Sequence, residues 1–292
     1  MRKVILLGHT GFVGSHLYKS LVQTLPEVPL VGSSFPELDL TRSESVGILK
    51  ALFDRHTVVI LCSGIKRQFG DSPDIFEKNV AMCLNVVRAL EVSPVARMVF
   101  FSSMAVYGED IHNIGIDENT PICPRSYYGL AKYVGELVFE RIFSRQNGSY
   151  VAIRLPVIYG PGDGGNTYGP AGFLKAAMEG RVVTLWGDGE ELREFIFIDD
   201  VVEIVKRLLT VEYQGVVNVT AGKSYSFRDI LNILDRLLPQ GVQVASRARS
   251  KDKVDNASCN AKIQQWTGGF VFTALEDGIR KMFEVEKSRV KP

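Results

Sequence analysis

The sequence lacks the features of several large classes of protein. Its four cysteines (62, 83, 123 and 259) and four histidines (9, 16, 56 and 112) do not have the spacing of a metal site. No apolar run approaches the length of a membrane span, and the run that follows Lys3 ends at Gly8, which is too early for a signal peptide. We therefore expect a reduced, metal-free, cytoplasmic protein.

An excess of charge of either sign is also missing. The 292 residues include 34 Lys and Arg against 33 Asp and Glu, and no long basic run interrupts them. Neither nucleic acid nor an anionic membrane is therefore expected as a partner. Hydrophobic residues make up 46% of the chain, which is ample for the core of one large domain or of two lobes.

The N-terminal segment combines a short buried strand with glycines. Lys3 to Leu7 reads as the strand, and a helical pattern runs from the following loop to about Leu25. Glycines at 8, 11 and 14 allow a tight turn and a close approach of backbone to a pyrophosphate at the helix N-terminus. Their spacing differs by one residue from the G-x-G-x-x-G pattern, and a simple glycine-rich turn is the alternative.

An acidic residue is absent where the second strand, Pro29 to Ser33, ends. Such an acid would bind the adenosine ribose and reject a 2′-phosphate, so Ser33 and Ser34 favour NADP(H) over NAD(H). Asp39 is predicted to accept a hydrogen bond from the adenine amino group. Its alternative role is to cap a helix near residues 43 to 54.

The third strand, Val58 to Cys62, ends in Ser63 and Gly64, where the backbone is expected to meet the cofactor. A helix over 73 to 92 follows, with serine and proline in the positions that start a helix. Asn79 lies in this helix, where it holds a neighbouring backbone or faces water.

Three residues with acid, base and hydroxyl chemistry follow the fourth strand, Met98 to Phe101. Ser103 stands at the strand end that faces the ligand crevice in doubly wound folds, although serines are also ordinary loop formers. Tyr128 and Lys132 are one helical turn apart and share a face. A nearby ammonium stabilises phenolate, so the pair is a candidate general acid/base.

In chain order, the three glycines, the SSMAVYG segment around Ser103, and Tyr128 and Lys132 with Glu136 after them resemble the extended short-chain dehydrogenase/reductases, in particular the nucleotide-sugar epimerase/dehydratase group. The run from Arg154 to Gly162 is similar to that family's R-x-x-N-V-Y-G-P. The run from Trp186 to Asp200 is similar to its G-D-G-x-x-x-R-D-F-x-x-V-D-D, with Glu194 in place of Asp.

The resemblance spans essentially the whole chain and implies an α/β fold, a doubly wound parallel Rossmann sheet with a smaller C-terminal α/β substrate lobe. We expect the lobes to interleave, with residues 1–155 and 195–220 binding NAD(P) and residues 156–194 and 221–292 binding the nucleotide-sugar. Family members often dimerise through the helices matching 73–92 and 126–145, so a homodimer is expected.

The resemblance also implies roles for individual residues. Tyr128 would be the acid/base at a sugar oxygen, Lys132 would bind the nicotinamide ribose, and Ser103 would orient the same sugar oxygen. Arg193 would bind the diphosphate, with a surface salt bridge to Glu190, Glu191 or Glu194 as the alternative. The predicted substrate-binding residues are Ser103, Leu185, Trp186, Arg193, Arg249 and Asp252. The predicted cofactor-binding residues are Gly8, Thr10, Gly11, Phe12, Val13, Gly14, Ser33, Asp39, Leu40, Cys62, Ser63, Gly64, Asn79, Tyr128, Lys132 and Pro156.

Differences within the family narrow the reaction. Met104 and Ala105 stand where 4,6-dehydratases carry an Asp-Glu pair, and Met104 stands where dual epimerase-reductases carry a cysteine, so both activities are disfavoured. The predicted function is reduction of the C4 ketone of a nucleotide-linked 4-keto-6-deoxyhexose. The alternatives are an NAD-dependent nucleotide-sugar 4-epimerase and a non-catalytic NAD(P)-binding sensor, although such sensors commonly lose the Tyr or the Lys.

Overall fold

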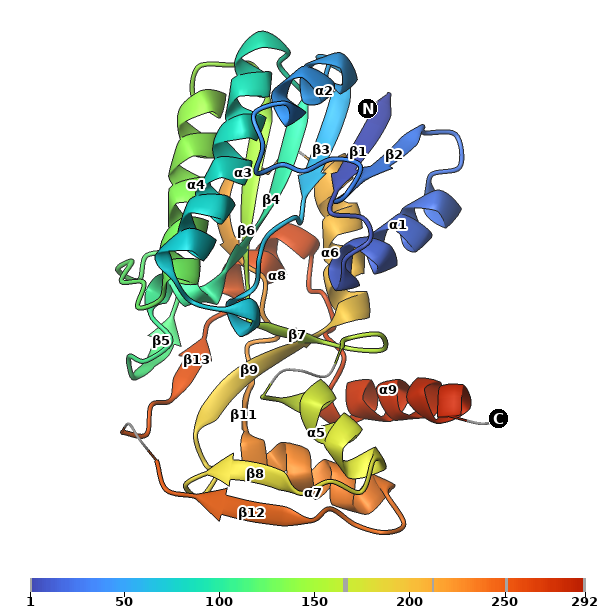
Figure 1. Cartoon of the computed structure of the whole chain (residues 1–292), viewed down its shortest axis with the longest axis vertical. Coiled ribbons are helices and arrows are strands. Elements are labelled where there is room, and N and C mark those ends of the chain that lie inside the picture. Colours follow the sequence, from blue (N-terminus) through green and yellow to red (C-terminus); the bar gives the residue numbers. More distant parts are fainter. Residues whose placement is uncertain (1, 165–167, 212, 250–251, 291–292) are drawn as a thin grey trace. The chain divides into compact units, whose positions relative to one another are not determined.

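The computed structural model describes residues 2–164, 168–211, 213–249 and 252–290 (Figure 1). The chain divides into two compact units. Unit 1 comprises residues 1–109, 120–155 and 202–218, and unit 2 comprises residues 110–119, 156–201 and 219–292. These ranges differ from the expected lobes chiefly at residues 110–119 and 195–201, both of which belong to unit 2. Residues 110–119 do so because β5 (Asn113–Ile116) pairs with β13 (Asn256–Ser258).

Unit 1 is built on a parallel sheet of six strands in the order β2-β1-β3-β4-β6-β10. This order confirms the predicted doubly wound Rossmann sheet. All the carboxyl ends of its strands meet at one edge, which is where ligands bind in such folds. The strands are β1 (Lys3–Leu7), β2 (Leu30–Ser33), β3 (Thr57–Leu61), β4 (Arg97–Ser103), β6 (Ser149–Leu155) and β10 (Gly215–Asn218).

Helices cover both faces of this sheet, as Figure 1 shows. On one face α2 (Ser45–Leu52), α3 (Pro73–Val92) and α4 (Tyr127–Phe143) enclose a core that includes Phe100 and Phe139. On the other lie α1 (Phe12–Thr24) and the part of α6 (Ile198–Thr210) that belongs to unit 1. Because both faces are covered, the central strands are apolar and buried along most of their length.

Serine caps determine where the two long helices start. The Ser72 hydroxyl accepts a hydrogen bond from the Ile75 amide, with Pro73 as the first helical residue of α3. The Ser126 hydroxyl likewise accepts from the Gly129 amide, 3.0 Å away, at the start of α4. Tyr128 is thereby fixed in the first turn of α4.

Unit 2 contains three small sheets and four helices within the described residues. β9 (Leu192–Phe197) lies between β7 (Val157–Tyr159) and β11 (Ser224–Ser226), and β8 (Val183–Trp186) pairs in parallel with β12 (Val244–Arg247). The third sheet is the β5–β13 pair. The helices are α5 (Pro170–Met178), α7 (Phe227–Leu237), α8 (Ala261–Thr267) and α9 (Leu275–Val290). Across the ranges described above, we find no helix with the length and apolar character needed to cross a membrane.

Candidate active site

The loop between β1 and α1 has the geometry of a phosphate-binding turn. Gly8 adopts φ +97°, and a side chain there would meet the backbone of Ser63 at the end of β3. A side chain at Gly14 would run into the Gly8 carbonyl, so α1 lies against the turn. Within the described residues, no side chain caps α1 after Gly11. Amides at an uncapped helix start are a favourable place for a phosphate, and the binding of a pyrophosphate here stays a prediction.

The end of β2 is occupied by hydroxyl and imidazole groups. The Ser33 carbonyl accepts from the Gly8 amide at 2.8 Å, and the Ser34 hydroxyl accepts from the Thr10 amide at 3.1 Å. The same Ser34 hydroxyl lies 2.9 Å from Nδ1 of His9, a residue that no sequence motif marks as functional. The packed His9 ring covers Gly32, where a side chain would clash with it.

Asp39 makes a local turn instead of capping a helix. Its Oδ1 accepts from the Thr41 amide at 3.0 Å and from the Thr41 hydroxyl at 2.6 Å, and the hydroxyl bond is the largest cause of a lowered pKa of Asp39. The alternative prediction of a cap is wrong, because α2 begins at Ser45 with Glu44 in the cap position. The side chain of Leu40 lies in the core, 5% exposed.

At the end of β3, Cys62 and Ser63 both donate backbone hydrogen bonds to the Leu7 carbonyl. Asn79 of α3 holds the next turn of this loop. Its side-chain oxygen accepts from the Ile65 amide at 2.8 Å, and its nitrogen donates to the Ile65 carbonyl at 3.1 Å. Of the two alternatives for Asn79, the structure therefore shows the one in which it holds a neighbouring backbone.

Lys132 lies beside Tyr128, and Ser103 ends β4, the strand whose Phe101 carbonyl holds Lys132. The Lys132 ammonium lies 5.7 Å from the centre of the Tyr128 ring and donates a hydrogen bond to the Phe101 carbonyl at 2.7 Å. Lys132 is 8% exposed. The Ser103 hydroxyl accepts from the Ala105 amide at 3.2 Å and can still donate its own proton.

Two loops hold the first turn of α4. The Tyr128 amide donates to Asp71 at 3.1 Å, and the Ser126 hydroxyl donates to Glu109 at 2.9 Å. Arg67 joins the loops because its guanidinium contacts Glu109 at 3.1 Å and lies 4.0 Å from Asp71. No sequence motif identifies these residues, since long-range pairing of surface charges has no local signal.

A buried polar network connects β6 and the end of β4 with α4, the helix that carries Tyr128 and Lys132. Arg154 of β6 makes two parallel hydrogen bonds to Glu136 of α4, at 2.9 and 2.6 Å. Glu136 also accepts from the hydroxyl of Ser102, the neighbour of Ser103. The second Arg154 amino group donates to the Tyr107 hydroxyl at 2.6 Å, which donates to Asn218 at 2.8 Å. The network ties the β4 end to α4, one turn after Lys132.

In unit 2, Arg193 is fixed on β9 by backbone oxygens. Its Nη1 donates to the carbonyls of Leu192 at 2.8 Å and Val254 at 2.5 Å. Its Nη2 lies 3.3 Å from Glu191, the salt bridge that was the alternative for this residue. Burial is the main cause of a lowered pKa of Arg193.

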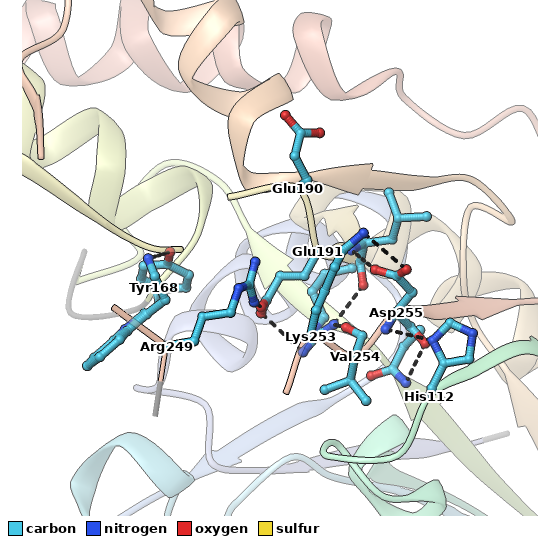
Figure 2. A network of polar contacts seen from close by, with 12 residues as sticks. His112, Tyr168, Glu190, Glu191, Arg249, Lys253, Val254 and Asp255 are labelled. Carbon is cyan, nitrogen blue, oxygen red and sulfur yellow. Dashed lines mark hydrogen bonds and ion pairs between the residues drawn. The ribbon is translucent and has the colours of Figure 1, made fainter. Parts of the chain in front are cut away.

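Arg249 joins the same carboxylate (Figure 2). Its Nη1 pairs with the second Glu191 oxygen, while its Nη2 contacts Asp188 at 2.7 Å. The guanidinium crosses Gly187, where an added side chain would collide with it. The structure thus brings Arg193 and Arg249 to one anionic group, an association that the sequence spacing did not predict.

The remaining predicted substrate residues have contrasting surroundings. Leu185 is 1% exposed and lies in the interior, whereas Trp186 is 38% exposed and packs beside the Arg247 guanidinium. The Trp186 amide donates to the Tyr168 hydroxyl at 3.1 Å. Asp252 is exposed, and Pro156 is partly exposed between β6 and β7.

Comparison with known proteins assigns the family. A model of the NAD dependent epimerase/dehydratase family matches residues 4–220. The chain belongs to this family. It is therefore an enzyme of the extended short-chain dehydrogenase/reductases, and its cofactor is a nicotinamide dinucleotide, NAD(H) or NADP(H).

Two curated relatives are named as a 4-epimerase and a putative 4-epimerase. The chain is 27% identical to the N-acetyl-alpha-D-glucosaminyl-diphospho-ditrans,octacis-undecaprenol 4-epimerase of Escherichia coli O157:H7, over 99% of this chain and 84% of the relative. It is 25% identical to a putative UDP-glucose 4-epimerase of Methanocaldococcus jannaschii, over 79% and 81%.

Solved structures show the same fold in an epimerase and in RMD. UDP-glucose 4-epimerase from Thermotoga maritima, solved with UDP-glucose, has a TM-score of 0.85 at 19% identity. RMD from Pseudomonas aeruginosa, complexed with NADPH, has a TM-score of 0.84 at 22% identity. Each comparison covers 99% of this chain and 100% of the other.

Proposed function

We propose that this family member reduces the C4 ketone of a nucleotide-linked 4-keto-6-deoxyhexose, with Tyr128 as the acid and NADP(H) as the preferred cofactor. The observation that carries the proposal is the Lys132 ammonium, 5.7 Å from the Tyr128 ring and fixed by the Phe101 carbonyl. The glycine loop and the uncapped start of α1 would hold the dinucleotide phosphates.

The residues that would transfer and stabilise the proton, Ser103, Tyr128 and Lys132, all lie in unit 1. The Tyr128 hydroxyl would donate its proton to the ketone oxygen as the carbonyl is reduced, and Lys132 would stabilise the phenolate that remains. The Ser103 hydroxyl would donate a hydrogen bond to the same oxygen and hold it in line. The bound nicotinamide supplies the hydride.

The surroundings of β2 support reduction with NADP(H). Between Ser33 and Asp39 the sequence has one acid, Glu37, and Asp39 is engaged by Thr41. Ser34 is held by the Thr10 amide and lies beside His9, and none of these groups carries a negative charge that would repel a 2′-phosphate.

A 4-epimerase is the second candidate, and the two curated relatives described above favour it. In that reaction Tyr128 would first accept the proton of the C4 hydroxyl and later return it. The cofactor would then be recycled within each turnover instead of being consumed.

In unit 2, Arg193 and Arg249 would bind the diphosphate of the nucleotide-sugar. The support is that both guanidiniums approach one carboxylate, which shows that they are close enough to share an anionic group. Trp186, exposed beside them on β8, would stack on the nucleotide base.

The main test replaces Tyr128 by Phe. We expect a loss of turnover of about 100-fold or more, measured as NADPH consumption with a panel of 4-keto-6-deoxy sugar nucleotides. The matched control is Tyr127→Phe, since Tyr127 is the adjacent residue of α4 and is 41% exposed. Full turnover by Tyr128→Phe would remove the acid/base assignment.

A second experiment separates the two candidate reactions. Freshly purified protein is denatured, the released nicotinamide is identified by mass spectrometry, and the emptied protein is titrated with NADPH and NADH. Tighter binding of NADPH to a protein that releases no cofactor supports the reductase. Near-stoichiometric NAD in the purified protein supports the epimerase.

A further inference from the structure

We propose that Glu191 is a resident competitor for the diphosphate, a carboxylate that occupies Arg193 and Arg249 until the two phosphates of the substrate displace it. This inference rests on the proposed diphosphate role of the two arginines. It adds a residue that sets how tightly nucleotide ligands bind and how fast they leave.

Glu191 bridges the two arginines. Each oxygen of Glu191 pairs with a different guanidinium, Oε1 with Nη2 of Arg193 and Oε2 with Nη1 of Arg249. A single carboxylate therefore engages the donors of both arginines that a diphosphate would need. The carboxylate carries one negative charge and a diphosphate carries at least two, so displacement of the carboxylate by the diphosphate is favourable.

Both arginines have contacts other than Glu191 that hold them in position. Arg193 is held by the carbonyls of Leu192 and Val254. Arg249 crosses Gly187 and is held from its other side by Asp188. Because these contacts remain when Glu191 leaves, its carboxylate mainly neutralises the pair, and positioning falls to the other groups.

Solvent and ligand can reach all three side chains. The side chains of Glu191, Arg193 and Arg249 are 16%, 21% and 19% exposed. Figure 2 shows the pair of Glu191 and Arg249. Partial exposure lets water and ligand reach the ion pairs, whereas a sealed pair could not exchange its partner without unfolding its surroundings.

The test measures nucleoside diphosphate affinity for Glu191→Gln. UDP, GDP, CDP and dTDP are titrated calorimetrically into the full chain, with NADP⁺ or NAD⁺ at saturation, whichever the emptied protein binds more tightly, so that the cofactor site does not contribute. We expect the tightest of the four to bind Glu191→Gln about tenfold more tightly than the wild type. Its dissociation, followed by stopped flow, should slow by a similar factor.

The matched control is Glu190→Gln. This change removes the same charge from the neighbouring position, where Glu190 pairs with Arg228 and its side chain is 48% exposed. Its affinity should stay within about twofold of the wild type. Glu191→Ala should also tighten binding, which excludes an effect of the new amide.

The opposite sign overturns the proposal. If Glu191→Gln and Glu191→Ala bind the diphosphate more weakly, Glu191 positions the arginines and does not compete. Failure of the underlying assignment gives a different result: Arg193→Met and Arg249→Met would then bind as the wild type does. Absence of binding by all four diphosphates to the wild type and to Glu191→Gln would overturn both proposals.

Discussion

Each unit contains an arginine paired with a glutamate, but the two pairs differ in burial. Arg154 and Glu136 of unit 1 are 5% and 4% exposed and form a bidentate pair. Glu191 of unit 2 is divided between Arg193 and Arg249, all three partly exposed. The same two functional groups thus serve as an internal tie in one unit and as an exchangeable pair in the other.

The difference follows from what surrounds each guanidinium. Arg154 also donates a hydrogen bond from Nη1 to the Tyr107 hydroxyl, and burial leaves no solvent to replace a lost partner. Arg249 has an exposed partner in Asp188, 60% exposed, and a glycine beneath it. A carboxylate can therefore leave Arg249 at small cost, whereas Glu136 cannot leave Arg154.

The largest expected effect is the loss of the buried pair. Glu136→Gln leaves an uncompensated buried guanidinium, so we expect the free energy of unfolding to fall by about 3–5 kcal/mol in urea denaturation. Glu191→Gln should change it by less than about 1 kcal/mol. Equal effects of the two changes would mean that the buried Glu136 and the partly exposed Glu191 do not differ in their contribution to stability. If Glu136→Gln does not fold, the double change Glu136→Leu with Arg154→Met should restore a folded protein.

A smaller loss is expected from Tyr107→Phe. The variant removes the hydroxyl that accepts from Arg154 and donates to Asn218. We expect a decrease of about 1.5–3 kcal/mol in the free energy of unfolding, the range for hydrogen bonds to charged groups. The exposed Tyr127→Phe is the control and should be near neutral. An unchanged free energy of unfolding in Tyr107→Phe would mean that Glu136 alone stabilises the buried Arg154.

On the side of unit 2, Gly187→Ala tests the support of Arg249. Gly187 has φ +62°, and the added side chain would push against the guanidinium. Backbone strain should cost about 1 kcal/mol of stability, and diphosphate affinity should fall by roughly three- to tenfold. Gly180→Ala is a close control, because Gly180 has φ +66° and open space around it. It should lose the same stability and keep its affinity; a matching loss of affinity would separate Gly187 from Arg249.

The fold was predictable because its signals are local. Apolar strands, the serine before Pro73 and the glycines of the first turn each determine a nearby stretch of chain. The burial of Leu185 was also within reach: β8 alternates buried and exposed residues, which turns Leu185 inward and Trp186 outward. The sharing of Glu191 was not, since Arg249 is 58 residues away and nothing in its own segment identifies a partner.

The smallest expected effect concerns a second buried glutamate in unit 2. Glu194 is 7% exposed, accepts from the amide and hydroxyl of Ser258, and burial raises its pKa above the usual 4.5. The folded protein therefore holds this proton to higher pH than the unfolded chain does. Stability from this group is full below the usual pKa and declines as the pH rises through the raised value.

Glu194→Gln has no such proton to lose, so the difference between its free energy of unfolding and that of the wild type should increase as the pH rises above the usual glutamate pKa of 4.5. Urea denaturation at several pH values measures this difference, with Glu190→Gln as the same change of charge at an exposed position. A constant gap for Glu194→Gln would mean that the carboxyl titrates alike in the folded and unfolded chain. Burial alone would then not distinguish Glu194 from the partly exposed Glu191. The contrast between the buried Glu136 and the exchangeable Glu191 would instead depend on the arginines with which each is paired.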